Sequence, residues 1–244
     1  MDNFIPEIIR YWLGEKRNEN SKIIDPTAMQ AAYICGRSQA TSSNAKGKEP
    51  INRKERTLFN LAIRPLEESA LTNWACETGL WINERDFEKQ FANRKIGQGA
   101  EQVVFLNQNG REVIKVNSGN YHGNWLEFFN RLICHSLFFP STQYDVIGFT
   151  QFNDTFSVVI KQPFALLNEG APREIVEPYL HQYGFIRTKN DDYYNGKLGI
   201  ILEDLHDENI FLLDGQILFI DPVIYFETPE MGLNQNVLYR FPFT

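Results

Sequence analysis

The stretch "LEDLHDENIFLLDGQILFIDP", residues 202–222, gathers acidic and amide residues around two apolar segments. The segments, 210–213 and 216–220, flank the dipeptide Asp214-Gly215. An Asp-Gly pair between apolar runs predicts a tight β-hairpin, because its turn needs positive φ at both central residues. The open end of this hairpin therefore collects the polar residues, while its two strands carry almost no charge.

The register of the predicted hairpin brings two oxygen-bearing side chains together. Pairing across a two-residue turn sets Asn209 opposite Ile220. Asn209 and Asp221 then become neighbours at roughly 5–8 Å, a distance that one hard cation such as Mg²⁺ could bridge. Both strands are apolar at nearly every position, which predicts a hairpin covered on both faces. The alternative is an acidic loop that caps a hairpin, since turns collect Asp and Asn for local hydrogen bonds.

The composition indicates a chain that can bury a large core and that carries net negative charge. Hydrophobic residues make up 43% of the 244 residues, and the formal net charge is −7. No basic stripe stands out, so we expect no nucleic-acid partner. The first residues lack the pattern of a signal peptide, and no apolar run reaches the roughly 18 residues of a membrane span. Together with three scattered cysteines, these features predict a cytoplasmic protein with reduced thiols and no membrane partner, and they leave the oligomeric state open.

The hydrophobic pattern predicts helices first and strands later. Helices are expected around residues 5–12 and 28–35, and a longer one over 53–81 with a kink at Pro65. A segment rich in Ser, Gly and Lys, 36–50, is expected to be a linker or a mobile loop. Further strands are expected at 103–106, 112–116, 145–149, 156–160, 198–202, 210–213 and 216–220, and further helices at 125–137 and 172–183. This order of elements predicts an α+β protein with two lobes.

A glycine-containing turn forms a second candidate site. In "KIGQGAEQVVF", residues 95–105, Gly97 and Gly99 lack a Cβ. Their backbone can therefore approach a ligand closely, and N–H groups in such a turn can bind phosphate oxygens. The alternative is an ordinary glycine turn between two strands.

A lysine interrupts the apolar strand "REVIKV" that follows. A hairpin with Asn109-Gly110 at its turn sets Lys115 opposite Val104, and therefore beside the glycine turn. A fixed ammonium group there could hold phosphates, and it would need an acidic partner because an unpaired, half-buried charge is costly. The alternative is a lysine whose ammonium group extends past the sheet edge into water.

Glu127 is the first acidic residue of the helix expected at 125–137, and it is the candidate partner of Lys115. It lies off the main apolar stripe of that helix. The alternative is a surface ion pair with Arg131, one helical turn further on. Both interpretations stay open.

The candidate residues occur in the order that is typical of the protein-kinase-like superfamily. The segment "DLHDEN", residues 204–209, resembles the D-L-H-x-x-N loop of aminoglycoside phosphotransferases and, more loosely, that of HipA-type kinases. The chain is most similar to the polyvalent protein kinase family of bacterial mobile elements and phages. That family also combines a helical lead-in, here at 74–81, with a "G-x-G-A-E-Q" loop and a final "H-x-x-N…D" hairpin. The resemblance covers residues 53–244.

The resemblance implies a role for each residue of the final hairpin. Asp204 would be the catalytic aspartate that orients or deprotonates an acceptor hydroxyl, and His206 would lie near the transferred phosphate. Asn209 and Asp221 would hold Mg²⁺ on the nucleotide phosphates.

The resemblance also implies an activity and the residues that bind the nucleotide. Gly97 and Gly99 would cover the phosphates, Lys115 would contact the α- and β-phosphates, and Glu127 would orient Lys115. The implied activity is an ATP- and Mg²⁺-dependent phosphotransfer to a hydroxyl of an unidentified protein or small molecule. A nucleotide-binding pseudokinase or interaction module, and nucleotidyl transfer by the same fold, are the alternatives.

The implied fold is a two-lobed kinase-like fold with a helical N-terminal extension. Its C-terminal lobe is expected to be reduced, because only a short segment follows Asp221. The expected regions are an N-terminal extension with a linker at 1–52, a helical lead-in at 53–92, a kinase-like N-lobe at 93–166 and a reduced C-lobe at 167–244. The two hairpin turns, at 109–110 and 214–215, are expected in different lobes with the nucleotide between them.

Overall fold

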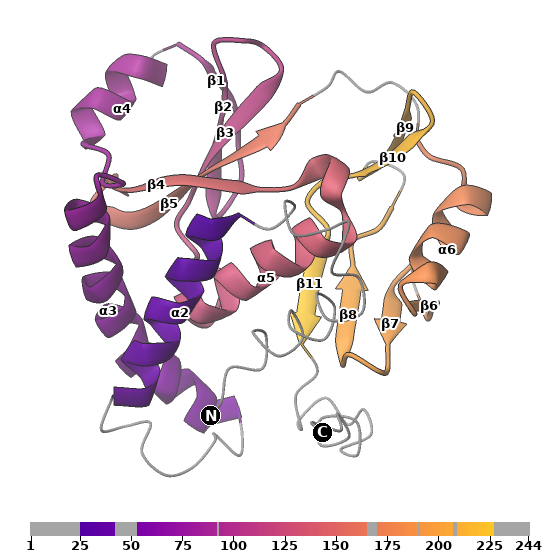
Figure 1. Ribbon diagram of the computed structural model, residues 1–244, viewed down its shortest axis with the longest axis horizontal. Helices are drawn as coiled ribbons and strands as arrows, with labels where there is room; N and C mark the ends of the chain where they lie inside the picture. The colour runs from indigo at the N-terminus through magenta and orange to yellow at the C-terminus, as the bar shows by residue number, and fades with distance from the viewer. Residues whose placement is uncertain are drawn as a thin grey trace. The chain divides into compact units, whose positions relative to one another are not determined.

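The computed structural model describes residues 25–41, 53–91, 93–164, 170–189, 191–206 and 209–226. The chain divides into two compact units. Figure 1 labels the helices and strands of the chain. The first unit comprises Met1–Leu137 and Gln143–Ala165, and the second comprises Phe138–Thr142 and Leu166–Thr244. Helices and antiparallel sheets together give mixed α and β structure, in agreement with the predicted α+β class. The kinase-like lobes and their boundaries remain predictions.

The first unit is built on a five-stranded antiparallel sheet with the strand order β1-β2-β3-β5-β4. Its elements are α2 (Pro26–Thr41), α3 (Arg53–Thr78), α4 (Glu84–Phe91), β1 (Lys95–Gln98), β2 (Gln102–Leu106), β3 (Glu112–Asn117), α5 (Trp125–Phe138, whose last residue belongs to the second unit), β4 (Asp145–Phe152) and β5 (Thr155–Pro163). The helix α4 and the strand β1 were not predicted from the sequence.

Helices cover both faces of this sheet. Side chains alternate between the two faces along each strand, so neighbouring strand residues contact different helices. On one face, Phe87 and Phe91 of α4 pack with Ile114 and Val116 of β3 in one apolar cluster. Lys115, which lies between those two strand residues, points to the opposite face.

The helix α5 packs against the face of the sheet that carries Lys115. The ring of Trp125 lies 5.0 Å from that of Phe156, and the ring of Phe129 lies 6.2 Å from that of Phe149, measured between centroids. The two strand residues belong to β5 and β4, so α5 lies across the part of the sheet farthest from β1.

The helices α2 and α3 pack against each other in the first unit (Figure 1). The side chains of α2 that are buried there include Ala28, Ala31, Ala32 and Cys35, whose small size allows two helices to approach closely. The helix α2 continues to Thr41, so the linker predicted from residue 36 begins later than expected.

The longer helix, α3, differs from its prediction at its C-terminal end. It continues through Pro65 and ends at Thr78, three residues before the predicted end at Trp81. Trp81 instead forms an isolated parallel bridge with Phe149 of β4. The helix predicted at 5–12 lies outside the described residues. Among the described helices, none is both long and apolar enough to cross a membrane.

The second unit contains two small antiparallel sheets and one helix. Its elements are η1 (Pro140–Thr142), α6 (Arg173–Gln182), β6 (Ile186–Arg187), β7 (Tyr193–Asn195), β8 (Ile200–Glu203), β9 (Ile210–Leu213), β10 (Gln216–Phe219) and β11 (Val223–Phe226). The strands are ordered β11-β8-β7-β6 in one sheet, and β10 and β9 form the other.

Aromatic side chains form the core of the second unit. The ring of Phe219 lies 4.2 Å from that of Phe139 and 5.3 Å from that of Tyr179, measured between centroids. The Tyr179 hydroxyl donates to the carbonyl of Phe138 at 2.6 Å, and the Thr142 hydroxyl donates to the carbonyl of Phe219 at 2.7 Å. These contacts fix the strand β10 at the end from which the chain continues to Asp221.

The β9–β10 hairpin has the turn and register predicted for it. Asp214 and Gly215 have φ values of 50° and 80°, both positive, and Leu213 pairs with Gln216. The predicted burial of both faces holds at the open end, where Ile210, Leu218 and Phe219 are buried. It fails at the tip, where Leu212 and Leu213 are 39% and 40% exposed. The hairpin is a two-stranded sheet of its own, so its tip has no neighbouring strand in the described part of the chain.

The hairpin between β2 and β3 has the predicted register but a different turn. Val104 pairs with Lys115 as expected. The N–H of Asn107 donates to the carbonyl of Glu112 at 2.9 Å, so four residues form the loop. Gly110 alone has positive φ in this loop, at 66°, and the two-residue Asn-Gly turn is therefore not formed.

Candidate functional site

The predicted catalytic residues form a hydrogen-bonded cluster at the open end of the β9–β10 hairpin. The side-chain amide of Asn209 donates to the backbone oxygen of Asp204 at 2.9 Å and to its carboxylate at 3.1 Å. The Nε2 atom of His206 lies 3.1 Å from the other carboxylate oxygen of Asp204 and 3.3 Å from the Asn209 amide nitrogen. Three of the four candidate residues in the second unit are thus in direct contact.

Two strand pairings place Asp221 beside this cluster. In the continuation of the β9–β10 ladder, the N–H of Ile220 donates to the carbonyl of Asn209 at 2.7 Å. Asp221 follows Ile220 directly, as the predicted register requires. The second pairing joins β8 to β11 and was not predicted from the sequence.

The pairing of β8 with β11 brings the two candidate aspartates to the same corner. Glu203 pairs with Val223, so Asp204 leaves β8 where Asp221 and Pro222 lead into β11. Asp204 and Asp221 have φ values of 64° and 51°, a backbone region that few residues other than glycine adopt and that Asp tolerates.

The oxygen atoms at this corner are of the type that binds a hard cation such as Mg²⁺. Because the Asn209 amide nitrogen is directed at Asp204, its amide oxygen is the atom that could bind a cation, together with the Asp221 carboxylate. In the described residues, no group of three or more His, Cys, Asp or Glu side chains is placed to hold a metal ion. Mg²⁺ commonly takes only one or two protein ligands and completes its shell with phosphate oxygens and water.

In the first unit, Gly97 and Lys115 lie in one row across the sheet. Gly97 pairs with Val104, which pairs with Lys115, which in turn pairs with Ile160. Directly paired residues share a face of the sheet, so the missing side chain of Gly97 leaves open surface two strands from the lysine. The row thus places Gly97, an apolar valine and Lys115 in succession on one face of the sheet.

The Lys115 side chain is buried between the sheet and aromatic residues. Lys115 is 3% exposed, and its ammonium nitrogen lies 5.4 Å from the centroid of the Tyr144 ring. His135 of α5, which is 2% exposed, packs against the same ring in a tilted arrangement, with 4.4 Å between the centroids. Neither His135 nor Tyr144 was predicted from the sequence. A histidine within the apolar run of α5 was the available sign of a polar neighbour.

Glu127 binds Arg131 and the start of its own helix. One carboxylate oxygen lies 2.5 Å from the Arg131 guanidinium, and the other accepts the N–H of Gly123 at 3.1 Å. The ion pair that was the alternative interpretation is thus formed. The role of Glu127 in orienting Lys115 remains a prediction.

The glycine hairpin is a tight connection between β1 and β2. The N–H of Gly99 donates to the carbonyl of Gln102 at 2.8 Å. Neither Gly97 nor Gly99 has positive φ, and an added Cβ would lie 3.8 Å or more from its nearest neighbour. The fold of the hairpin does not itself require glycine there, which is consistent with close approach of a ligand as the reason.

A separate hollow lies on the other face of the same sheet. It has a volume of about 440 Å³, and its apolar lining includes Phe87, Phe91, Phe105 and Phe152. None of the candidate residues of either unit is among the described residues that line it. This hollow is therefore distinct from the Lys115 face.

Comparison with known proteins identifies one family. The family model described as "Serine/Threonine/Tyrosine Kinase found in polyvalent proteins" matches residues 65–228. The matched segment includes both glycines of the hairpin, Lys115 and the whole of the final hairpin. No curated protein and no solved structure matches the chain.

Proposed function

Because the chain belongs to the serine/threonine/tyrosine kinases found in polyvalent proteins, we propose that it transfers the γ-phosphoryl group of ATP to an acceptor hydroxyl. The observation that carries the proposal is the contact of Asp204, His206 and Asn209 at the hairpin end that leads to Asp221. This cluster lies within the segment that the kinase family matches.

Asp204 is assigned the proton-accepting role in this reaction. The acceptor oxygen forms a bond to the γ-phosphorus, and the bond from that phosphorus to the β–γ bridging oxygen breaks. ADP leaves, and the hydroxyl proton passes to the Asp204 carboxylate. The Asn209 amide and the His206 ring, which lie 3.1 Å from the two carboxylate oxygens, hold the carboxylate in one orientation.

The remaining candidate residues are assigned to the triphosphate. The oxygens of Asn209 and Asp221 would hold Mg²⁺, which neutralises phosphate charge when it is bound. Lys115 would contribute a fixed ammonium group to the phosphates, and the Gly97–Gly99 backbone would lie over them. The acceptor is a hydroxyl of a protein or a small molecule.

Two variants test the assignment of both units to one nucleotide. Lys115→Met and Asp221→Asn should each weaken ATP binding in the presence of Mg²⁺, by about tenfold for the loss of one charged contact. Only Asp221→Asn should also remove the tightening that Mg²⁺ gives. Calorimetric titration of ATP with and without Mg²⁺ measures both effects, and circular dichroism checks that the variants fold.

Labelled ATP then identifies the reaction. Transfer of the γ-label to the protein or to an added acceptor supports phosphotransfer. Transfer of the α-label would mean nucleotidyl transfer, and ATP binding without either transfer would mean a pseudokinase. Unchanged ATP affinity in both variants would refute the assigned binding residues.

A further inference from the structure

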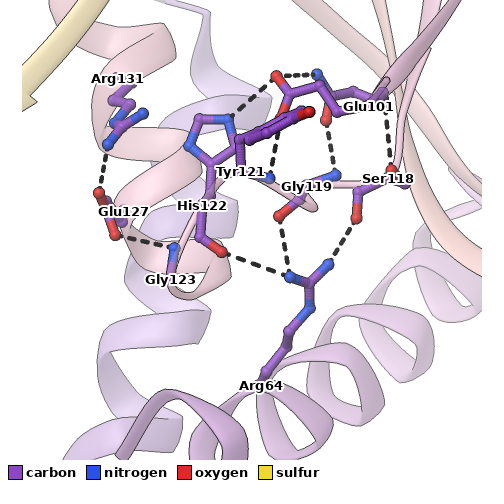
Figure 2. Close-up of polar contacts among 10 residues, drawn as sticks. Arg64, Glu101, Ser118, Gly119, Tyr121, His122, Gly123, Glu127 and Arg131 are labelled. Carbon is purple, nitrogen blue, oxygen red and sulfur yellow. Dashed lines mark hydrogen bonds and ion pairs between the residues drawn. The ribbon is translucent and has the colours of Figure 1, made fainter. Parts of the chain in front are cut away.

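The loop between β3 and α5, residues 118–124, is held from one side by the helix α3. Figure 2 shows Arg64 of α3 reaching three backbone carbonyls of this loop. Its guanidinium donates to Ser118 at 2.6 Å, to Gly119 at 2.9 Å and to His122 at 3.5 Å. The same guanidinium lies over the ring of Trp125, 5.0 Å from its centroid.

The packing of this loop against Arg64 and Trp125 depends on a glycine. Gly119 has a φ of 64°, which disfavours other residues. A Cβ at Gly119 would lie 2.9 Å from the Trp125 ring and 3.3 Å from the Arg64 guanidinium. The loop could therefore not lie this close to both Trp125 of α5 and Arg64 of α3 with a larger residue at position 119.

Glu67, one turn further along α3, holds the residues that follow this loop. Glu67 is fully buried, and its carboxylate accepts the N–H of Trp125 at 2.8 Å and that of Leu126 at 3.3 Å. These are the first residues of α5, whose N–H groups have no partner inside the helix. The helix α3 therefore holds the loop and the start of α5 together.

From the other side, the loop is held by Glu101 at the tip of the glycine hairpin (Figure 2). The Glu101 carboxylate accepts the N–H of Tyr121 at 3.1 Å and the side-chain amide of Asn117 at 3.3 Å. It also lies 3.7 Å from Nε2 of His122. The backbone oxygen of Glu101 accepts the N–H of Ser118 at 2.9 Å.

The electrostatics favour an ionised Glu101. Burial raises the pKa of Glu101, but the hydrogen bond and charge of His122 and the donors on Tyr121 and Asn117 outweigh that effect. The pKa is therefore lowered from its ordinary value. An ionised carboxylate that accepts several hydrogen bonds makes a stronger link than a neutral group.

We propose that α3 holds the glycine hairpin in place for the nucleotide phosphates through this loop, with Arg64 and Glu101 as the two positioning residues. Neither residue is assigned a contact with ATP. The link runs from Arg64 to the loop carbonyls, along the loop, and from Tyr121 and His122 to Glu101. The part of the inference that concerns phosphates rests on the proposed function, whereas the link itself does not.

Hydrogen exchange of the nucleotide-free protein tests the link. Arg64→Ala should raise amide exchange by about tenfold in residues 118–124 and also in the hairpin at 96–104, because each loses local stability. Arg85→Ala, which removes an exposed arginine from α4 of the same unit, is the matched control and should change neither segment. Faster exchange in 118–124 with an unchanged hairpin would overturn the proposal.

Nucleotide binding tests the purpose of the link. Glu101→Ala should raise the Kd for ATP about tenfold and leave the Kd for adenosine within about twofold, since only ATP presents phosphates to the hairpin. Glu88→Ala, which removes an exposed carboxylate from α4, is the control. Equal losses for both ligands would assign Glu101 a merely structural role and refute the proposal. If the wild type bound neither ligand, the proposed function would fail, and the exchange experiment alone would decide whether the link exists.

Discussion

Lys115 in the first unit and the Asp204 cluster in the second unit are assigned to the same nucleotide, yet they are held in different ways. Lys115 is 3% exposed in the middle of a five-stranded sheet. The side chains of Asp204 and His206 are 51% and 45% exposed at the mouth of a hairpin. Packing therefore fixes the lysine, whereas strand register and mutual hydrogen bonds fix the cluster.

This difference predicts at which residue a substitution changes activity without also changing the stability of the fold. A change at Lys115 disturbs its sheet neighbours and its contact with Tyr144, so its effects on binding and on folding are mixed. A change at Asp204 removes a proton-accepting carboxylate that is half exposed, so it should alter turnover more than stability. The second unit is thus the better place to test catalysis alone.

The largest expected effect is at Asp204. Asp204→Asn keeps the shape of the side chain but cannot take a proton, so phosphotransfer should slow by about 10²–10⁴-fold, the usual contribution of general acid–base catalysis. The affinity for ATP with Mg²⁺ should stay within about threefold, because the metal ligands are unchanged. Turnover with labelled ATP and an ATP titration measure the two quantities.

Asp214→Asn is the matched control for this variant. It removes a carboxylate from the other end of the same hairpin, and Asn also tolerates the positive φ at that position. Its turnover should equal that of the wild type. If the wild type were active and Asp204→Asn retained full activity, the assignment of Asp204 would be wrong. Asp207 and Glu208 would then be the carboxylates to test.

The sequence predicted those parts of the fold and site that depend on neighbours along the chain. The Asp214-Gly215 turn and the pairing of Val104 with Lys115 followed from turn chemistry and from counting residues. The pairing of β8 with β11, which brings Asp204 toward Asp221, joins segments that show no shared pattern. Such long-range pairings follow from tertiary packing, which a single sequence does not reveal.

Two further errors have physical causes of the same kind. Apolar residues on both faces of β9 predicted a hairpin covered along its whole length, but Leu212 and Leu213 at its tip are exposed. Glu67 lies in the helix predicted at 53–81, and nothing local in the sequence distinguishes it from a surface glutamate. Its burial depends on α2 and on the start of α5, which lie far from it along the chain.

A smaller effect is expected from the pH dependence that Glu67 gives the first unit. Burial raises the pKa of Glu67 to about 7, although Gln39 and the N–H groups of Trp125 and Leu126 lower it. A carboxyl whose pKa is higher in the folded state contributes stability that is present below its unfolded pKa and is lost as pH rises through the folded value. The resulting loss between about pH 4.5 and pH 8 is about 3 kcal/mol.

Glu67→Gln removes this titration while keeping the shape of the neutral carboxyl. Urea unfolding of both proteins at pH values from 5 to 8 should show the wild type losing stability relative to the variant as pH rises. The other titrating groups cancel in the difference between the two proteins. Parallel stability curves would mean that Glu67 does not change its protonation on folding in this range.

The smallest expected effect is at the tip of the β9–β10 hairpin, where the comparison between the two units is sharpest. Leu213→Gln replaces a side chain that is 40% exposed and should change the free energy of unfolding by less than about 0.5 kcal/mol. Leu218→Gln, at an 8% exposed position in the partner strand, should cost about 2 kcal/mol or more because it buries an amide. Urea unfolding measures both values. If the two substitutions proved equally costly, the tip would be covered in solution, and the second unit would be held by packing as the first unit is.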